Sequence, residues 1–182
     1  MENINVLGIC GSLRRQSRNM GLLRYAQKQA PAGMNIKIAD LSEVPFYNAD
    51  FTEKPSAALA LLQEFALADA LLLACPEYNY SLAPALKNAL DWASREPDNV
   101  LLTGKPAAIL GAGGGMGSSR AQYHLRQVCV ALNLQPLIKP EIFSNAFSDS
   151  FDEAGELVDE RIQGLIVEQL RALQASVQRL RS

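Results

Sequence analysis

A nine-residue stretch near the amino terminus, GSLRRQSRN at residues 11–19, concentrates groups that bind anions. It follows an apolar run and precedes a helical pattern, so it should form the turn between a strand and a helix. Such a turn presents unpaired backbone N–H groups and the positive end of the helix dipole. Gly11 lets the backbone turn, and six side chains could bind phosphate oxygens: Ser12, Arg14, Arg15, Ser17, Arg18 and Asn19. The stretch therefore indicates a phosphate site, with a plain helix N-terminus capped by Ser17 or Asn19 as the structural alternative.

Two further polar loops follow later strand-like runs. Residues 75–81, CPEYNYS, combine aromatic rings, a carboxylate and an amide, whereas residues 111–119, GAGGGMGSS, are rich in glycine. In a parallel sheet, loops at the carboxyl ends of the strands emerge at one edge. We therefore expect both loops to face the first turn across one crevice.

Other classes of phosphate site fit the chain poorly. The P-loop pattern, which ends in Lys followed by Ser or Thr, does not occur in the sequence. The glycine run has Met116 where a dinucleotide fingerprint needs its third glycine. A cysteine phosphatase would need an arginine six positions after Cys10, where this chain has Gln16. Cys10 is therefore better interpreted as a small buried hydrophobe.

Composition limits the class of protein further. The chain has 182 residues, which suits one domain over residues 1–182, and its 17 Lys and Arg against 19 Asp and Glu argue against a nucleic-acid surface. No apolar run is long enough to span a membrane, and the amino terminus does not resemble a signal peptide. Three widely spaced cysteines match neither a disulfide framework nor a metal site. We expect a cytoplasmic protein without a bound metal.

Strand and helix patterns alternate along the chain. Strands are predicted at residues 4–10, 35–40, 70–74, 107–110 and 135–139, and helices at 20–30, 55–68, 84–95, 120–133 and 156–181. Residues 41–54 have no clear period and should form a long loop. Five such units predict an α/β fold, a flavodoxin-like, doubly wound, five-stranded parallel sheet in the order 2-1-3-4-5 with helices on both faces. In that order a crevice opens between the first and third strands, where the three polar loops meet.

Three motifs together resemble the NADPH-dependent FMN reductase family, and in particular its quinone and chromate reductases. They are GSLRRQSRN at residues 11–19, PEYNYS at 76–81 and LKNALDW at 86–92, and the similarity also includes QYHLRQ at 122–127. The resemblance implies a flavodoxin fold, bound FMN, and two-electron transfer from NADPH or NADH to a small acceptor. A quinone is the expected acceptor, with chromate, azo compounds or free flavin as others.

The resemblance also implies roles for individual residues. With Gly11 at the turn, the FMN phosphate would be held by Ser12, Arg14, Ser17 and Asn19. The edge of the isoalloxazine ring would lie against Pro76, Glu77, Tyr78 and Asn79. The third loop has fewer serines than is usual in the family, so contacts there would come from the backbone of Gly111, Gly113 and Gly114. No side chain is expected to act as a nucleophile, because the flavin carries the chemistry.

Family members form dimers and often tetramers, so a homodimer or homotetramer is expected here. Candidate interface residues are Phe46 and Tyr47 in the long loop and Arg120, Tyr123 and Arg126 on one helix face. The competing function is a flavodoxin-type electron carrier, which would bind FMN on the same fold and pass single electrons between proteins. The arginines of the first loop and the net charge of −2 favour the reductase. A flavin-free binding protein is a third alternative.

Overall fold

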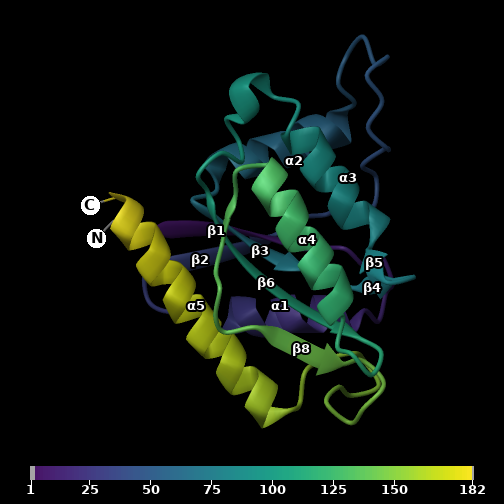
Figure 1. Cartoon of the computed structure of the whole chain (residues 1–182), viewed down its shortest axis with the longest axis vertical. Helices are drawn as coiled ribbons and strands as arrows, with labels where there is room; N and C mark the ends of the chain where they lie inside the picture. The colour runs from purple at the N-terminus through teal and green to yellow at the C-terminus, as the bar shows by residue number, and fades with distance from the viewer. Residues whose placement is uncertain (1–2, 182) are drawn as a thin grey trace.

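A parallel sheet of six strands crosses the middle of the molecule in this computed structural model, which describes residues 3–181. Its order is β2-β1-β3-β6 (Figure 1), and both β7 and β8 pair with the outer side of β6. The strands are β1 (Ile4–Cys10), β2 (Met34–Ile38), β3 (Ala70–Ala74), β6 (Pro106–Gly113), β7 (Gln135–Pro136) and β8 (Ile142–Asn145). The predicted flavodoxin-like order is confirmed, with β7 and β8 sharing the fifth position.

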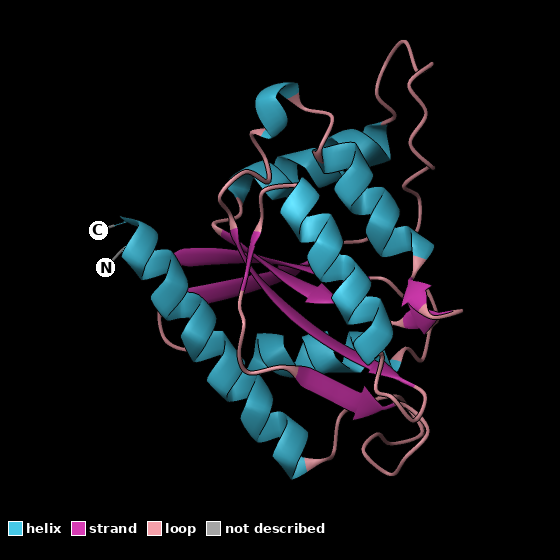
Figure 2. Cartoon of the chain, in the orientation of Figure 1, coloured by secondary structure: helices cyan, strands magenta, loops and turns pink. Residues whose placement is uncertain are grey.

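Helices cover both faces of the sheet, as Figure 2 shows. One face carries α1 (Arg18–Lys28) and α5 (Glu160–Arg181). The other carries α2 (Ser56–Leu67), α3 (Pro84–Ala93) and α4 (Ser119–Ala131). The predicted helices and the long loop after β2 are therefore present, and a short 3₁₀ turn, η1 (Pro97–Asn99), follows α3.

The central strand β3 shows why these runs form strands. Successive side chains of a strand point to opposite faces, so a strand covered on both sides must be apolar throughout. Leu71 and Leu73 pack in the core beneath α2, α3 and α4, whereas Leu72 packs in the core beneath α1 and α5. All three leucines are completely buried. The sheet thus divides the interior into two apolar cores, one on each face.

The prediction of the fifth strand is largely wrong. Of residues 135–139, only Gln135 and Pro136 pair with β6, and the main strand at this edge is β8, four residues long. Pro136 and Pro140 have no N–H to donate to the sheet. The hydrogen bonding of this segment to β6 is therefore interrupted between β7 and β8. Because β8 begins directly after this break and includes polar residues, its pattern is weak in the sequence.

Strand β6 is longer than predicted, because Gly111 and Gly113 belong to it rather than to the loop that follows. Gly111 pairs with Phe143 of β8, and no larger residue would fit there. A Cβ on Gly111 would lie 2.3 Å from Ser118 Oγ and 2.4 Å from the Cys75 carbonyl oxygen, well inside van der Waals contact. Glycine here is therefore a packing requirement of the sheet.

The last helix also differs from the prediction, since it begins at Glu160 and not at residue 156. Asp159 ends the preceding segment and its Oδ1 accepts a hydrogen bond of 3.1 Å from the Ile162 N–H, as an N-cap does. The segment before it is held by a bridge between Phe151 and Leu157. Within residues 3–181, none of the helices is both long and apolar enough to cross a membrane.

Candidate functional site

The loops that follow β1, β3, β6 and β8 meet at the carboxyl edge of the sheet around a cavity of about 130 Å³. Arg14, Arg18 and Asn19 line it from the first loop and the start of α1, opposite Pro76, Glu77 and Tyr78. The remaining lining residues are Ala112, Gly113, Gly114, Ala146 and Phe147. We call this cavity the crevice. The expected convergence of the three polar loops is thus observed.

Two predicted phosphate ligands already hold the first loop in place. Ser17 is the N-cap of α1, and its Oγ accepts a hydrogen bond of 3.2 Å from the Met20 N–H. The Asn19 side chain donates to the Ala112 carbonyl at 2.8 Å and accepts from the Ala112 N–H at 2.9 Å. Both side chains are buried. The capping alternative is therefore correct for Ser17, while Asn19 attaches the start of α1 to β6.

The arginines of the first loop are left with uncompensated charge. Among residues 3–181, Arg14, Arg15 and Arg18 form no ion pair with a carboxylate. Arg18 is half-buried, and its Nε is buried without a hydrogen-bond acceptor. The first N–H groups of α1 likewise have no acceptor within the helix. An unpaired buried donor beside two exposed cations is what a phosphate dianion would satisfy, so the residues present fit the phosphate of FMN.

The second polar loop contains a small hairpin, which its sequence pattern did not indicate. Strands β4 (Glu77–Tyr78) and β5 (Ser81–Leu82) pair antiparallel, and Asn79 and Tyr80 form the two-residue turn between them. Both turn residues have positive φ, 49° for Asn79 and 68° for Tyr80, as a type I′ turn requires. For tyrosine this conformation is unfavourable, so contacts elsewhere must stabilise it.

Those contacts come from the start of α4. The Glu77 side chain is only 7% exposed and forms an ion pair with Arg120, and its Oε2 accepts a hydrogen bond of 3.4 Å from the Ala121 N–H. The Arg120 guanidinium also lies over the Tyr80 ring, 3.7 Å from its centroid. The hydrogen bond to Glu77 raises the pKa of Arg120. Arg120 thereby holds the hairpin, and the Glu77 carboxylate is directed toward α4.

A further contact joins the hairpin to α4. Nδ1 of His124, the only histidine in the sequence, lies 3.2 Å from Ser81 Oγ. His124 is exposed on the helix surface, one turn beyond Arg120. His124 therefore supports β5, the second strand of the hairpin.

The third loop contributes backbone groups to the crevice. Gly114 has open space where a Cβ would stand, so a ligand can approach its backbone closely. Gly113 faces the crevice but packs against Ser118, whose N would lie 2.7 Å from a Cβ at that position. Gly111 lies deeper in β6 and is not among the residues that line the crevice. The loop can thus offer a ligand backbone groups without side-chain obstruction.

Seven of the twelve predicted FMN-contacting residues line the crevice, namely Arg14, Asn19, Pro76, Glu77, Tyr78, Gly113 and Gly114. Gly11, Ser12, Ser17, Asn79 and Gly111 are not among its lining residues. Gly11 lines an adjoining groove, and Ser12 is buried with its Oγ 3.4 Å from the Arg14 N–H. The sequence interpretation missed Ala146 and Phe147, because they follow β8, which was not predicted.

The cysteines lie in the core and not in the crevice lining. Cys10, Cys75 and Cys129 are all free and buried. Burial raises the pKa of each thiol, to about 12 for Cys75 and about 11 for Cys129. Thiols in this state are poor nucleophiles at neutral pH, which agrees with the interpretation of Cys10 as a small hydrophobe.

We predict that Asn19→Ala lowers the free energy of unfolding by about 2–4 kcal/mol, because it leaves the buried N–H and carbonyl of Ala112 without partners. Urea denaturation followed by circular dichroism measures the change. Asn35→Ala, at an exposed position of β2, is the control and should cost less than about 0.5 kcal/mol. Equal effects of the two substitutions would contradict a structural role for the Asn19 pair.

Comparison with known proteins agrees with this geometry. A model of the NADPH-dependent FMN reductase family matches residues 4–149. An NAD(P)H-dependent FMN reductase of Pseudomonas aeruginosa is 50% identical over 183 residues, which cover 99% of this chain and 98% of the relative. An NAD(P)H:quinone oxidoreductase of Solanum tuberosum is 45% identical over 186 residues, covering 98% and 95% of the two chains.

A solved structure extends the comparison to the fold. FerB, a flavoenzyme NAD(P)H:(acceptor) oxidoreductase from Paracoccus denitrificans, matches with a TM-score of 0.86 at 28% sequence identity and covers 97% of this chain and 98% of its own. The family model and the full-length relatives agree with the motifs of the first two loops. The chain therefore belongs to the NADPH-dependent FMN reductase family.

Proposed function

We propose that this chain is an FMN-dependent NAD(P)H oxidoreductase that reduces a small acceptor, with a quinone as the preferred class. The observation that carries the proposal is the crevice itself. It combines unpaired arginines at the N-terminus of α1 with accessible backbone at Gly114, at the switch point of a flavodoxin-like sheet. Relatives of nearly equal length are named FMN reductases and quinone oxidoreductases. Residues 1–182 would act as one FMN-binding domain in the cytoplasm, where three free thiols stay reduced.

The phosphate of FMN would be bound by the first loop. Arg14 and Arg18 line the crevice there and supply charge, while Ser12 and the first N–H groups of α1 supply hydrogen bonds. Ser17 and Asn19 would contribute mainly by holding this loop in position, because their side chains are already hydrogen bonded. Gly11 begins the turn that allows this approach.

The ring of FMN would lie between the second and third loops. Pro76 and Tyr78 line the crevice on one side, with Asn79 next to them in the hairpin turn, and the backbone of Gly113 and Gly114 lines it on the other. Bound there, FMN supplies two-electron transfer between a nicotinamide and an acceptor. The protein positions the reactants and places backbone donors near the ring, which stabilises negative charge as it develops. The overall reaction is NAD(P)H + H⁺ + quinone → NAD(P)⁺ + hydroquinone, and no side-chain nucleophile takes part.

We also propose that the chain forms a homodimer or homotetramer. An exposed aromatic side chain supports this, because Tyr123 on α4 is 53% exposed. Tyr123 is already oriented by a hydrogen bond of 3.1 Å to Glu141. Arg120 and Arg126 lie on the same helix, although both also make contacts within the chain.

The oligomeric state is tested by light scattering after size exclusion. We predict a dimer or tetramer for the wild type and a shift toward smaller species for Tyr123→Glu, which places a charge in the proposed interface. Leu180→Glu, on α5 at the opposite face of the sheet and 55% exposed, is the matched control. A monomeric wild-type protein would overturn the proposal.

The function is tested by the spectrum of the purified protein. We predict flavin absorption bands that bleach when NADPH or NADH is added without oxygen and return when a quinone follows. An electron carrier of the flavodoxin type would contain flavin but would not be reduced by either nucleotide. A colourless protein that fails to take up added FMN would contradict both the reductase and the electron-carrier hypotheses.

The phosphate site is tested by Arg14→Ala. Removing one charged hydrogen-bond donor should raise the dissociation constant for FMN by about tenfold to a hundredfold. The dissociation constant is measured by the quenching of flavin fluorescence when FMN is titrated with the apoprotein. Lys28→Ala removes the same charge at the opposite, exposed end of α1 and should leave the constant unchanged within about twofold. If both variants bind FMN equally well, the phosphate lies elsewhere.

A further inference from the structure

A second hollow adjoins the crevice on its α3 side. It has a volume of about 240 Å³, and we call it the acceptor groove. Gly11 of the first loop and Tyr78 of the hairpin border it, and Tyr78 also lines the crevice. Its other lining residues are Leu13, Leu41, Ser42, Val44, Phe46, Pro84, Ala85 and Asn88. A molecule in the groove would therefore lie directly beside the proposed flavin site.

The lining of the groove is apolar and carries no charged side chain. Of its polar side chains, Asn88 is already occupied, since its Oδ1 accepts from the Tyr47 N–H at 2.8 Å and its Nδ2 donates to the Pro45 carbonyl at 2.9 Å. A nicotinamide dinucleotide carries phosphates that this lining could not neutralise. Phe46 and Leu13, at 74% and 62% exposed, instead offer large apolar surfaces to a hydrocarbon group.

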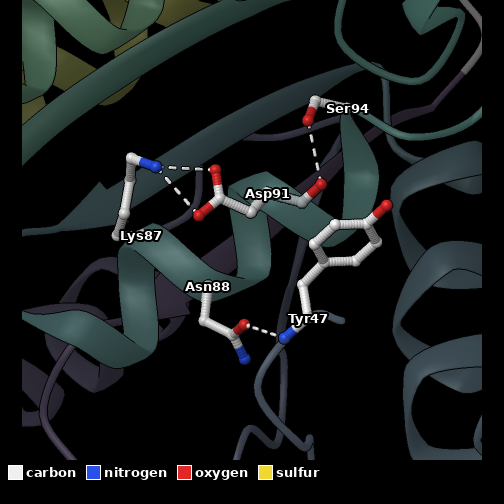
Figure 3. A network of polar contacts seen from close by, with 5 residues as sticks. All are labelled: Tyr47, Lys87, Asn88, Asp91 and Ser94. Carbon is white, nitrogen blue, oxygen red and sulfur yellow. Dashed lines mark hydrogen bonds and ion pairs between the residues drawn. The ribbon is translucent and has the colours of Figure 1, made fainter. Parts of the chain in front are cut away.

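The outer wall of the groove is held rigidly by α3, as Figure 3 shows for part of the network. Asn88 and Trp92, one helical turn apart, both donate to the Pro45 carbonyl, the latter at 2.8 Å. The rings of Tyr47 and Phe51 pack on Trp92 with centroids 5.1 and 5.8 Å away. The long loop is therefore fixed before any ligand arrives, which lowers the entropic cost of binding.

Figure 3 also shows how the outer surface of α3 is reinforced. Lys87 forms an ion pair with Asp91 at 2.7 Å, and Ser94 Oγ donates to the Asp91 carbonyl at 2.8 Å. These bonds lie within the helix and its C-terminal turn, so they stiffen the element that carries Asn88 and Trp92. The groove is thus a preformed apolar site whose outer wall is held by α3.

We infer that the acceptor groove binds the hydrocarbon substituent of an alkylated quinone, so that the quinone ring is placed at the crevice. The inference rests on the proposed function and specifies its acceptor. The quinone takes up a hydride equivalent and a proton to become the hydroquinone, and its side chain is unchanged. The groove thus selects quinones that carry an apolar chain over those that do not.

The test compares two quinones with the same dimethoxy-methyl-benzoquinone ring, one without a chain and one with a decyl chain. Ala85→Leu fills the groove, and it should raise the KM for the decyl quinone about tenfold while changing the KM for the chainless quinone less than about twofold. Phe46→Ala removes an exposed ring at the mouth without threatening the core, and it should raise the KM for the decyl quinone about threefold. Ala60→Leu, at an exposed position of α2, is the matched control.

A binding measurement independent of turnover accompanies the kinetics. Trp92 is the only tryptophan of the chain and packs on the groove's wall loop, so its fluorescence reports on the groove. Titrating the FMN-loaded, oxidised protein with the decyl quinone should quench Trp92 saturably. Ala85→Leu should weaken that binding about tenfold.

The outcomes separate the two proposals. If NAD(P)H fails to reduce the bound FMN of the wild type, the proposed function fails, while the fluorescence titration still decides the groove. If FMN is reduced normally but the variants affect both quinones alike, the groove inference is overturned and the function stands. If the variants alter only the oligomeric state, the groove binds a second copy of the chain, and the inference is again overturned.

Discussion

The crevice depends on one pair of hydrogen bonds between residues 93 positions apart in the chain. The Asn19 carboxamide binds both the N–H and the carbonyl of Ala112, as the backbone of a neighbouring strand would at the end of β6. This fixes the start of α1 against the third loop, across the carboxyl end of β3. Because Ser17 caps the same helix turn, the free N–H groups beside it keep one direction. The charged part of the site is thereby attached directly to the end of β6.

The hairpin of the second loop shows a different way to position a site. Its turn places Asn79 and Tyr80 at positive φ, and the hairpin is stable because α4 holds it from outside through Arg120. Glu77 neutralises Arg120, so this cation does not add to the field of the crevice. The positive potential is consequently concentrated at Arg14 and Arg18, on the side where a phosphate would bind.

The sequence was sufficient for features that depend on local pattern. An uninterrupted apolar run such as residues 70–74 predicts a buried strand, and a glycine and hydroxyl turn before a helix predicts an anion site. It was insufficient where partners distant in the chain decide the structure. Strand β8 pairs with residues 110–113 of β6, which are distant from it in the sequence. The pairing of Asn19 with Ala112 likewise cannot be inferred from either residue alone. Ala146 and Phe147 were missed for the same reason.

The buried cysteines have a consequence for durability. Reduced flavins react with oxygen, so proteins that use them work in the presence of peroxide, which oxidises thiolates to sulfenic and then to irreversible acids. Here every thiol lies in the core, and those of Cys75 and Cys129, with pKa values of about 12 and 11, are almost wholly protonated at neutral pH. The fold thus withholds its sulfur atoms from the oxidant that its own chemistry would generate.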